Sequence, residues 1–589
     1  MDLKLFIIFC FNIASASQGK KNLTRVLTKP CEILNDPKTV TTEVCSTFQD
    51  LIQYSKIWVD KSLIIKEIWK ENSTDVFIVT APRGWGKTMT LSMIGYYHQL
   101  PINANGSAAD RKTSANYLYF TEGEIIDNYL SSSAQQCDFS PLISGEQSLN
   151  NEHLANHPVI YVNGVDLVIG EHFVDCFRKM IWKTYQQHTS LYKLLIKKSL
   201  IANDDGENIE GSLNLVSFEK FVLYYNKFGS FPTTKSLILS IKEENIESSL
   251  NLDKFESYYV WSKIQNLDRE RLKLGIKILS DLLEKTYKRK VVILFDEYDS
   301  FILNTYFGEY FLRVPSSKQI LDVVDFLQEF VYETFKVNTH LVKGFITGVL
   351  PMLETTGLTG LNNVALQHVF GNDSFFPYYG IFDHEFRDLV SKRGMNQSSM
   401  EDAVAHYGGY HALGHLGDRI FSTFSAIEFV NTKVAKDYST LTRRISQLFQ
   451  QRNFSMDMAK VVKNWYKNKS VFKITHKQMT ELTVLNLETI YNLARKKINY
   501  ESDIHRNLVF SFLVSVGFLS VRPNQSNSNH EYQQYPIKTP KQVDITIPNM
   551  GIYLKIKRNI INYFKKYSGL FIESAELEFR WVDIILESK

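Results

Sequence analysis

The stretch from Asp75 to Thr88 constrains the fold of this chain more than any other. A short run of β-forming residues, Val76–Thr80, leads into a loop with two glycines, and a Lys-Thr pair and an apolar helical pattern follow. A phosphate-binding loop requires this order, because backbone N–H groups must surround the phosphate oxygens and the positive end of the helix must face the anion. The stretch therefore predicts a phosphate site between a buried strand and a helix.

Each residue type in this loop suits a nucleotide phosphate. Gly84 and Gly86 allow the backbone to approach the ligand closely. Lys87 would place a point charge on the β- and γ-phosphates, and the Thr88 hydroxyl would coordinate Mg²⁺. The usual G-x-x-x-x-G-K-[ST] pattern has Gly where this chain has Ala81, so a strand–turn–helix without a ligand remains the alternative. The nucleotide-binding candidates of the loop are Pro82, Arg83, Gly84, Trp85, Gly86, Lys87 and Thr88.

A second stretch, Lys290–Asp299, contains the acids that such a site needs. Its apolar run is typical of a strand buried on both faces of a parallel sheet, with its carboxyl end at the ligand edge. There Asp296 would hold Mg²⁺ together with Thr88, and Glu297 would polarise the attacking water as general base. Glu297 and Lys87 are the catalytic candidates. The alternative is an acidic pair that begins a solvated loop.

Further motifs accompany these two stretches. They are Val59–Ser62, Leu91–Met93, Gly344–Gly348, Gly360–Asn363, Tyr407–Tyr410 and Phe421–Ser425. With this order and spacing the chain resembles the AAA-ATPase-like family of predicted ATPases over roughly residues 56–570. The resemblance implies ATP and Mg²⁺ as cofactors.

The resemblance also implies that Thr347, near the end of a strand predicted at 340–349, senses the γ-phosphate. This requires the strand to lie between the loop strand and the acidic strand; a hydroxyl that caps the following turn is the alternative. Arg83, Arg443 and Arg444 are candidates for a charge-sensing arginine, and nothing in the sequence selects among them.

Many relatives append a nuclease-like domain with a D…E-x-K signature. Asp544 and Lys555–Lys557 resemble it, but Lys555 stands where the second acid is required, which leaves no place for the nuclease metal. Ile547–Asn549 matches the segment that precedes such a domain. We interpret the chain as a secreted type of member without the nuclease.

The alternation of strand and helix patterns predicts an α/β fold, a P-loop NTPase three-layer sandwich with a mostly parallel sheet, followed by a helical lid and a small C-terminal domain. Further elements are expected from apolar spacing, namely a strand at 157–162 and helices at 63–69, 173–185, 261–287, 383–392, 400–406, 418–432, 441–465, 504–519 and 554–567. The predicted divisions are a signal peptide 1–17, an N-terminal extension 18–55, a core 56–359 with an insertion at 201–256, a helical lid 360–500, and a helical or winged C-terminal region 501–589. The aromatic turn Tyr407–Tyr410 either packs in the core or faces a ligand.

Residues 1–17 have the features of a secretory signal peptide, with Lys4, a short apolar run and the small residues Ala14–Ala16 at the cleavage site. We expect a secreted or lumenal glycoprotein; with an uncleaved, buried N-terminus the protein would be cytoplasmic. No other run reaches transmembrane length. Cleavage leaves Cys31, Cys45, Cys137 and Cys176, whose pairing the sequence does not define. Glycosylation sequons stand at Asn22, Asn72, Asn105, Asn372, Asn396, Asn453, Asn468 and Asn524.

The net charge of +4 over 589 residues argues against a dedicated nucleic-acid binder and leaves a local basic patch open. The basic helix Lys555–Lys566 is most simply a solvated face. The leading prediction is Mg-dependent ATP hydrolysis coupled to a conformational switch or to assembly, with a protein partner or self-association. The alternative is an ATPase-derived binding or effector protein that acts on a partner without turnover.

Overall fold

The computed structural model describes residues 23–28, 47–55, 57–70, 74–123, 140–170, 172–191, 268–307, 315–352, 364–371, 374–413, 419–435, 443–467, 472–475, 477, 479, 481–522 and 542–568. The predicted signal peptide at 1–17, the predicted insertion at 201–256 and the motif Gly360–Asn363 lie outside these residues.

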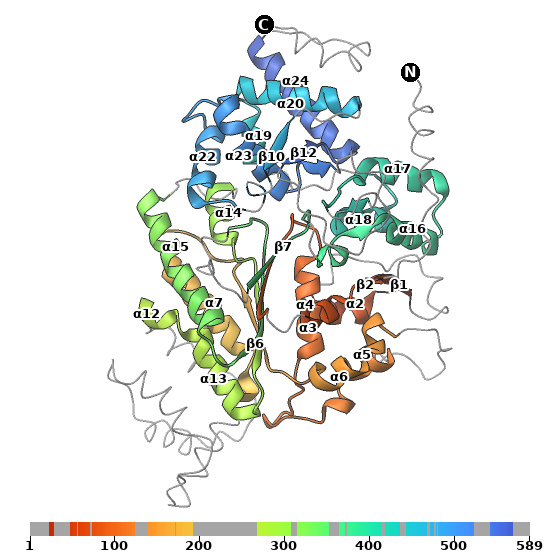
Figure 1. Cartoon of the computed structure of the whole chain (residues 1–589), viewed down its shortest axis with the longest axis vertical. Helices are drawn as coiled ribbons and strands as arrows, with labels where there is room; N and C mark the ends of the chain where they lie inside the picture. Colours follow the sequence, from red (N-terminus) through yellow and green to blue (C-terminus); the bar gives the residue numbers. More distant parts are fainter. Residues whose placement is uncertain are drawn as a thin grey trace, which may run out of the picture.

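A five-stranded parallel sheet forms the centre of the fold (Figure 1). Every residue of its strands β3 and β5 is buried, as the sequence predicts for strands covered on both faces. Strand β6 lies between β3 and β5, which is the position that a sensor role for Thr347 requires. The order across the sheet is β4 (Val159–Asn163), β5 (Val291–Asp296), β6 (Leu341–Gly348), β3 (Val76–Thr80) and β7 (Val364–His368).

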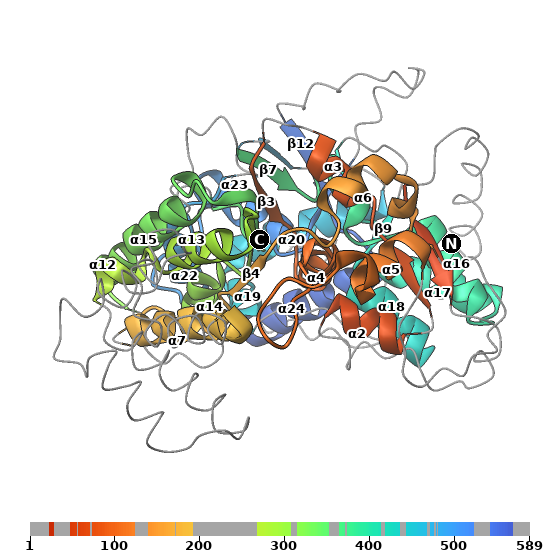
Figure 2. The same cartoon turned by 90° about the horizontal axis from the view of Figure 1, so that it is seen from below.

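Helices cover both faces of this sheet, so the core is a three-layer α/β sandwich (Figures 1 and 2). One layer contains α2 (Phe48–Tyr54), α3 (Ile64–Lys70), α4 (Lys87–His98), α5 (Ala115–Glu122) and α6 (Gln147–His153). The other contains α7 (Phe173–Gln186), α12 (Arg269–Leu272), α13 (Gly275–Tyr287) and α15 (Ser317–Val331). The short helix α14 (Ser300–Phe307) follows β5 directly.

Strand β7 corrects the predicted end of the core at residue 359. Val364–His368 pairs with β3 in parallel register and forms an edge of the sheet. Four of its five residues are only half-buried, because an edge strand has a neighbour on one side alone. It therefore lacks the continuous apolar run by which β3 and β5 are recognised.

A unit of three helices follows the core and has its own hydrophobic cluster around Phe386. It contains α16 (Asp383–Lys392), α17 (Gln397–Tyr407) and α18 (Thr423–Thr432), with the strand pairs β1 (Arg25–Thr28)–β2 (Ile57–Asp60) and β8 (Ile381–Phe382)–β9 (Ile420–Phe421). The predicted helix at 418–432 begins only at Thr423, because Ile420 and Phe421 pair with β8 instead.

The described residues from 443 to 568 pack as a second unit and do not divide at residue 500 as predicted. Strand β10 pairs with β12, and α20 packs against α23 and α24, so elements from both sides of that boundary share one core. The predicted helix at 441–465 is broken near Gln451, and the one at 504–519 ends at Ser515, before Gly517 at φ 77°. The elements are α19 (Arg443–Leu448), α20 (Arg452–Tyr466), β10 (Lys473–Thr475), α22 (Val484–Ala494), α23 (Ser502–Ser515), β11 (Ser520–Arg522), β12 (Gln542–Thr546) and α24 (Met550–Ser568).

None of the described helices combines the length and hydropathy needed to cross a membrane. Among the described residues, Cys176 on α7 is a free cysteine. Cys31, Cys45 and Cys137 lie outside them, so disulfide formation stays a prediction.

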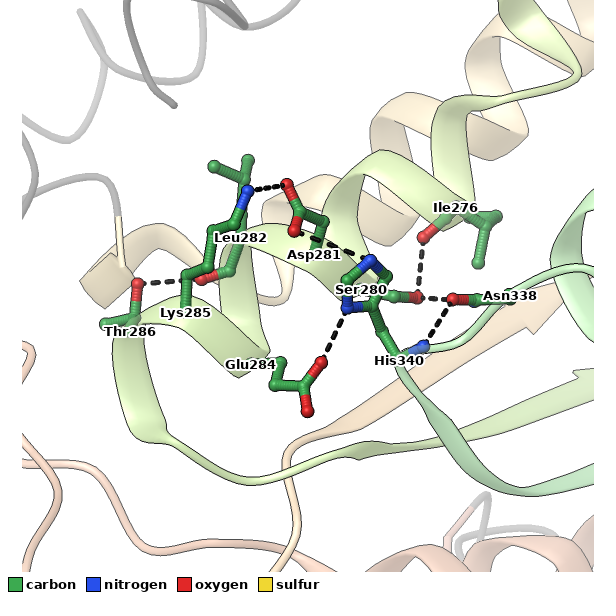
Figure 3. A network of polar contacts seen from close by, with 9 residues as sticks. All are labelled: Ile276, Ser280, Asp281, Leu282, Glu284, Lys285, Thr286, Asn338 and His340. Carbon is green, nitrogen blue, oxygen red and sulfur yellow. Dashed lines mark hydrogen bonds and ion pairs between the residues drawn. The ribbon is translucent and has the colours of Figure 1, made fainter. Parts of the chain in front are cut away.

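A polar network fixes the start of β6 to α13, at the amino end of the sheet (Figure 3). Asn338 donates its side-chain N–H to Ser280 Oγ at 3.0 Å and accepts the backbone N–H of His340 at 3.2 Å. His340 in turn lies between Glu284, at 2.5 Å, and Asp281, at 3.4 Å. The network holds β6 in register, which determines where Thr347 emerges at the opposite edge.

Three neutral histidines surround Trp69 at the same end of the sheet. His98 Nδ1 donates to the Ile94 carbonyl at 2.7 Å, so its Nε2 is free to accept the Trp69 Nε1–H at 3.0 Å. His157 Nδ1 likewise donates to the Lys290 carbonyl, and its Nε2 accepts from His153 at 3.3 Å. Burial lowers the pKa of all three, that of His153 to about 3.

This cluster predicts a loss of stability in mild acid. A histidine whose folded pKa lies below its ordinary 6.5 stabilises the fold fully above pH 6.5, and that stability falls as pH drops toward the folded pKa. For His98 alone the free energy of unfolding should fall between pH 6.5 and about 5, with a slope that approaches about 1.4 kcal/mol per pH unit. Urea unfolding of wild type and His98→Phe measures this: the difference between them should shrink over that range. A difference independent of pH would contradict the prediction.

Candidate functional site

The loop between β3 and α4 has the conformation that its glycines allow. Gly84 and Gly86 lie at φ 78° and 84°, a left-handed region that other residues rarely adopt, and Gly86 is the N-cap of α4. A Cβ on Gly84 would lie 3.0 Å from Phe424 Cβ. The loop also makes hydrogen bonds to this neighbour, since Phe424 N–H and Ser422 Oγ both donate to the Gly84 carbonyl, at 2.8 and 3.1 Å. The start of α18 therefore contacts the loop directly.

The ammonium group of Lys87 lies inside the curve of this loop. It donates to the carbonyls of Ala81 at 2.8 Å and Pro82 at 3.0 Å, and the residue is only 4% exposed. Burial lowers the pKa of Lys87, and the nearby carboxylate of Glu297 acts against that shift. Since its hydrogen bonds among the described residues go to neutral carbonyls, the buried ammonium group can turn to an anionic ligand that enters the loop.

Asp296, at the carboxyl end of β5, joins three elements of the site. Its carboxylate accepts the Thr88 hydroxyl of α4 at 2.7 Å, the Thr347 hydroxyl of β6 and the Tyr161 hydroxyl of β4 at 3.0 Å. The structure therefore brings together the predicted residues Thr88, Asp296 and Thr347. The pKa of the Tyr161 hydroxyl is raised, first by burial and then by the charge of Asp296.

The oxygens of Thr88 and Asp296 fit a magnesium ion. Both are hard oxygen donors, and they lie within 2.7 Å of one another. The described residues contain no group of three His, Cys, Asp or Glu side chains that could hold a metal by themselves. Mg²⁺ suits this donor set, because proteins commonly hold it through one or two oxygens together with substrate phosphates.

Glu297 has a strained backbone. Its φ is 54°, uncommon for a residue other than glycine, and its side chain is half-buried beside Lys87. The neighbouring segment leaves no room to relax, since a Cβ on Gly164 would lie 2.7 Å from the Glu297 carbonyl oxygen. Such strain tends to occur at functional positions, where the surrounding structure maintains it.

The acidic motif divides between two tasks. Asp296 and Glu297 lie beside the loop, whereas Tyr298 and Asp299 bind the segment that follows β6. Asp299 accepts the backbone N–H groups of Val349 and Leu350 at 2.8 and 2.6 Å. The Tyr298 hydroxyl accepts the backbone N–H of Met352 at 3.0 Å. Burial, followed by the charge of Glu297, raises the pKa of Asp299 to about 6. The same segment reaches the C-terminal unit, since Leu482 N–H donates to the Pro351 carbonyl.

The remaining loop candidates differ in where they point. Trp85 is buried edge-on against Phe370 and Tyr410, each at 5.1 Å between ring centroids, so its side chain anchors the loop. Pro82 is also buried and has no backbone N–H to donate, whereas Arg83 is exposed.

Tyr410 is itself buried, which confirms core packing for the aromatic turn. The side chains of Arg443 and Arg444 lie outside the described set.

Sequence reasoning missed Tyr161 and the contact of Ser422 and Phe424 with the loop. Tyr161 carries the one side-chain hydroxyl in the apolar strand β4, which pairs with β5, and this could have been the signal. No local pattern could have indicated the second contact, which joins residues about 340 positions apart.

A family model described as a predicted AAA-ATPase, AAA-ATPase-like, matches residues 224–359. The matched residues include the acidic motif at 296–299 and Thr347, and they end before β7. The match supports the AAA-ATPase-like family and with it nucleotide binding. Neither the curated proteins nor the solved structures contain a match to the chain.

Proposed function

We propose that this chain binds ATP at the loop of residues 81–88 as a P-loop protein, and that it hydrolyses the nucleotide with Mg²⁺ to drive a conformational switch or assembly. The observation that carries the proposal is the hydrogen bond of 2.7 Å between Thr88 and Asp296 beside the enclosed ammonium group of Lys87. The family match supports the nucleotide part of the proposal.

Catalysis in such a site consists of positioning and electrostatics. Lys87 would turn from the Ala81 and Pro82 carbonyls to the β- and γ-phosphates, and the N–H groups at the start of α4 would face the same oxygens. Bound Mg²⁺ neutralises charge that develops on the phosphates, and Thr88 and Asp296 would hold it. Glu297 would orient the attacking water and accept its proton, while Thr347, through Asp296, would register the γ-phosphate.

The unit formed by α16, α17 and α18 is the proposed lid. Its contact with the loop, through Ser422 and Phe424, supports this role. The link from Tyr298 and Asp299 to the segment 349–352, and on to Leu482, is a route by which the state of Glu297 would reach the C-terminal unit.

We also propose that the protein is secreted and that the segment from Asp544 to Lys557 is not a nuclease site. Asn105, Asn396 and Asn453 are exposed sequon residues among those described; Asn22, Asn72, Asn372, Asn468 and Asn524 lie outside the described set. Asp544 lies 3.8 Å from Lys473, and Lys555 is buried. The described residues offer no cluster of acids around Asp544 of the kind that a nuclease metal requires.

Titration of purified protein with Mg-ATP tests the proposal. Lys87→Met removes the ammonium group but keeps the buried stem, so binding should weaken about 10- to 100-fold through loss of a charged hydrogen bond. Lys179→Met, at an exposed position of α7, is the control and should bind as wild type. If wild type binds no Mg-ATP, the proposal fails and the alternative, a binding or effector protein without turnover, takes its place.

A further inference from the structure

We propose that the outward faces of α20 and α24 bind the phosphate backbone of a nucleic acid without reading its sequence. The six residues that define this basic face are Lys460, Lys463 and Lys467 of α20 and its C-cap, and Arg558, Lys565 and Lys566 of α24. The proposal is independent of ATP turnover. It departs from the interpretation of the basic helix as a solvated face.

Helix α24 separates an apolar side from a basic side. Its 19 residues include five Lys or Arg and no acid. Ile552, Ile556, Ile560 and Phe564, four residues apart, are at most 4% exposed and face the core of the unit. Arg558 and Lys565 are exposed on the opposite side, so the charged groups that this side presents to solvent are cations.

Helix α20 continues the positive charge. Lys460, Lys463 and Lys467 stand three and four residues apart and so share one side of the helix. The single acid of α20, Asp457, has a side chain only 1% exposed. Asp457 lies 3.2 Å from Lys460, but it also accepts from Arg506 at 3.1 Å, so two cations share one carboxylate and the surface keeps its positive charge.

The two helices are neighbours at one end of the molecule (Figure 1). Trp465 of α20 stacks on Tyr553 of α24 with 5.2 Å between ring centroids. Six cations over two packed helices can interact with a polyanion that carries many charges. The phosphate backbone of a nucleic acid is such a polyanion, and each neutralised phosphate releases counterions.

A membrane surface fits this face less well. A helix that lies on a membrane buries its apolar side among the lipids, whereas the apolar side of α24 is already covered by the protein. Leu554, 47% exposed, is the single large hydrophobic residue that the described part of α24 exposes, and the described side chains of α20 include none.

The fold of the C-terminal unit indicates that it would not read the bases of the bound nucleic acid. From α20 to β12 the order is helix, strand, helix, helix, strand, strand, and the sheet order is β10-β12-β11, which is the arrangement of a winged-helix domain. In helix-turn-helix proteins a recognition helix enters the major groove. Here the second half of the corresponding helix, α23, is buried from Val509 to Ser515, and its Phe512 stacks on Phe307 of α14 at 4.9 Å. The first turn of α23 exposes Asp503, whose negative charge opposes approach to a phosphate backbone.

Salt-dependent binding of a mixed-sequence DNA duplex of about 24 base pairs tests the proposal, by fluorescence anisotropy with the full chain. Wild type should bind with a slope of log K against log salt near about −5, from about 0.9 for each of six contacts. Arg558→Glu/Lys565→Glu/Lys566→Glu should weaken binding at about 150 mM salt at least about 100-fold and reduce the slope by about 3. A second duplex of unrelated sequence should bind equally.

The matched control reverses three exposed cations of the α/β core, Lys179, Arg289 and Lys318, which do not belong to the basic face, and should bind within about 3-fold of wild type. Circular dichroism and Mg-ATP binding check that the test variant is folded. The proposal is overturned if the duplex does not bind wild type at low salt, if both triple variants lose affinity equally, or if vesicles with phosphatidylserine bind the face and the duplex does not.

Discussion

Glu297→Gln is expected to lower the rate of ATP hydrolysis by about 10²- to 10⁴-fold and to leave Mg-ATP binding nearly unchanged. Glutamine keeps the size and polarity of the side chain but cannot accept a proton from the attacking water. The residue is half-buried beside Lys87, at the end of the strand that carries Asp296. Single-turnover release of phosphate, with nucleotide binding measured on the same samples, separates the two effects.

Asp299→Asn is the matched control, because it also removes one negative charge two residues away. The charge of Asp299 also acts on Lys87, but the hydrogen bonds of its carboxylate go to backbone N–H groups of the segment after β6, so its replacement should reduce stability more than turnover. A Glu297→Gln enzyme that hydrolyses ATP at the wild-type rate would remove Glu297 from the role of general base. Equal loss of binding and turnover would instead mean that the strained backbone at φ 54° has changed.

The sequence was informative where one short segment determines its own structure. The strands β3 and β5 are continuous apolar runs buried on both faces, and the predicted helix at 383–392 has the bounds of α16. The candidate site could be predicted for the same reason, because the Lys87-Thr88 and Asp296-Glu297 pairs each stand at the end of a strand or just after it, at one edge of a parallel sheet. Parallel strands place both pairs at the same edge, where the Thr88 hydroxyl lies 2.7 Å from the Asp296 carboxylate.

The sequence was uninformative where a contact joins distant segments. Lys61 belongs to a motif that we recognised by resemblance, but no periodicity shows that its partner is Glu385, 324 positions later. The edge strand β7 escaped prediction because it is half-buried, and β9 because two residues are too few for a pattern. In each case tertiary packing, and not local propensity, determines the structure.

The buried ion pair of Lys61 and Glu385 joins the segment between β2 and α3 to α16 of the three-helix unit. Lys61 donates to both carboxylate oxygens at 2.7 and 2.9 Å and to the Pro377 carbonyl, and the side chains are 10% and 0% exposed. Burial lowers the pKa of Lys61, and Glu385 opposes that shift. A buried charge without its partner is strongly unfavourable.

Lys61→Met is therefore expected to lower the free energy of unfolding by about 3–5 kcal/mol, measured by urea denaturation. Adding Glu385→Gln should restore part of the loss, because glutamine removes the unpaired charge and still accepts the N–H of Phe382. Lys66→Met breaks the exposed pair with Glu146, whose side chains are 48% and 33% exposed, and should cost less than about 1 kcal/mol. Because α16 and α18 belong to one unit, loss of the Lys61–Glu385 pair should also weaken Mg-ATP binding. If Lys61→Met and Lys66→Met unfold at the same urea concentration, other contacts hold the three-helix unit to the core.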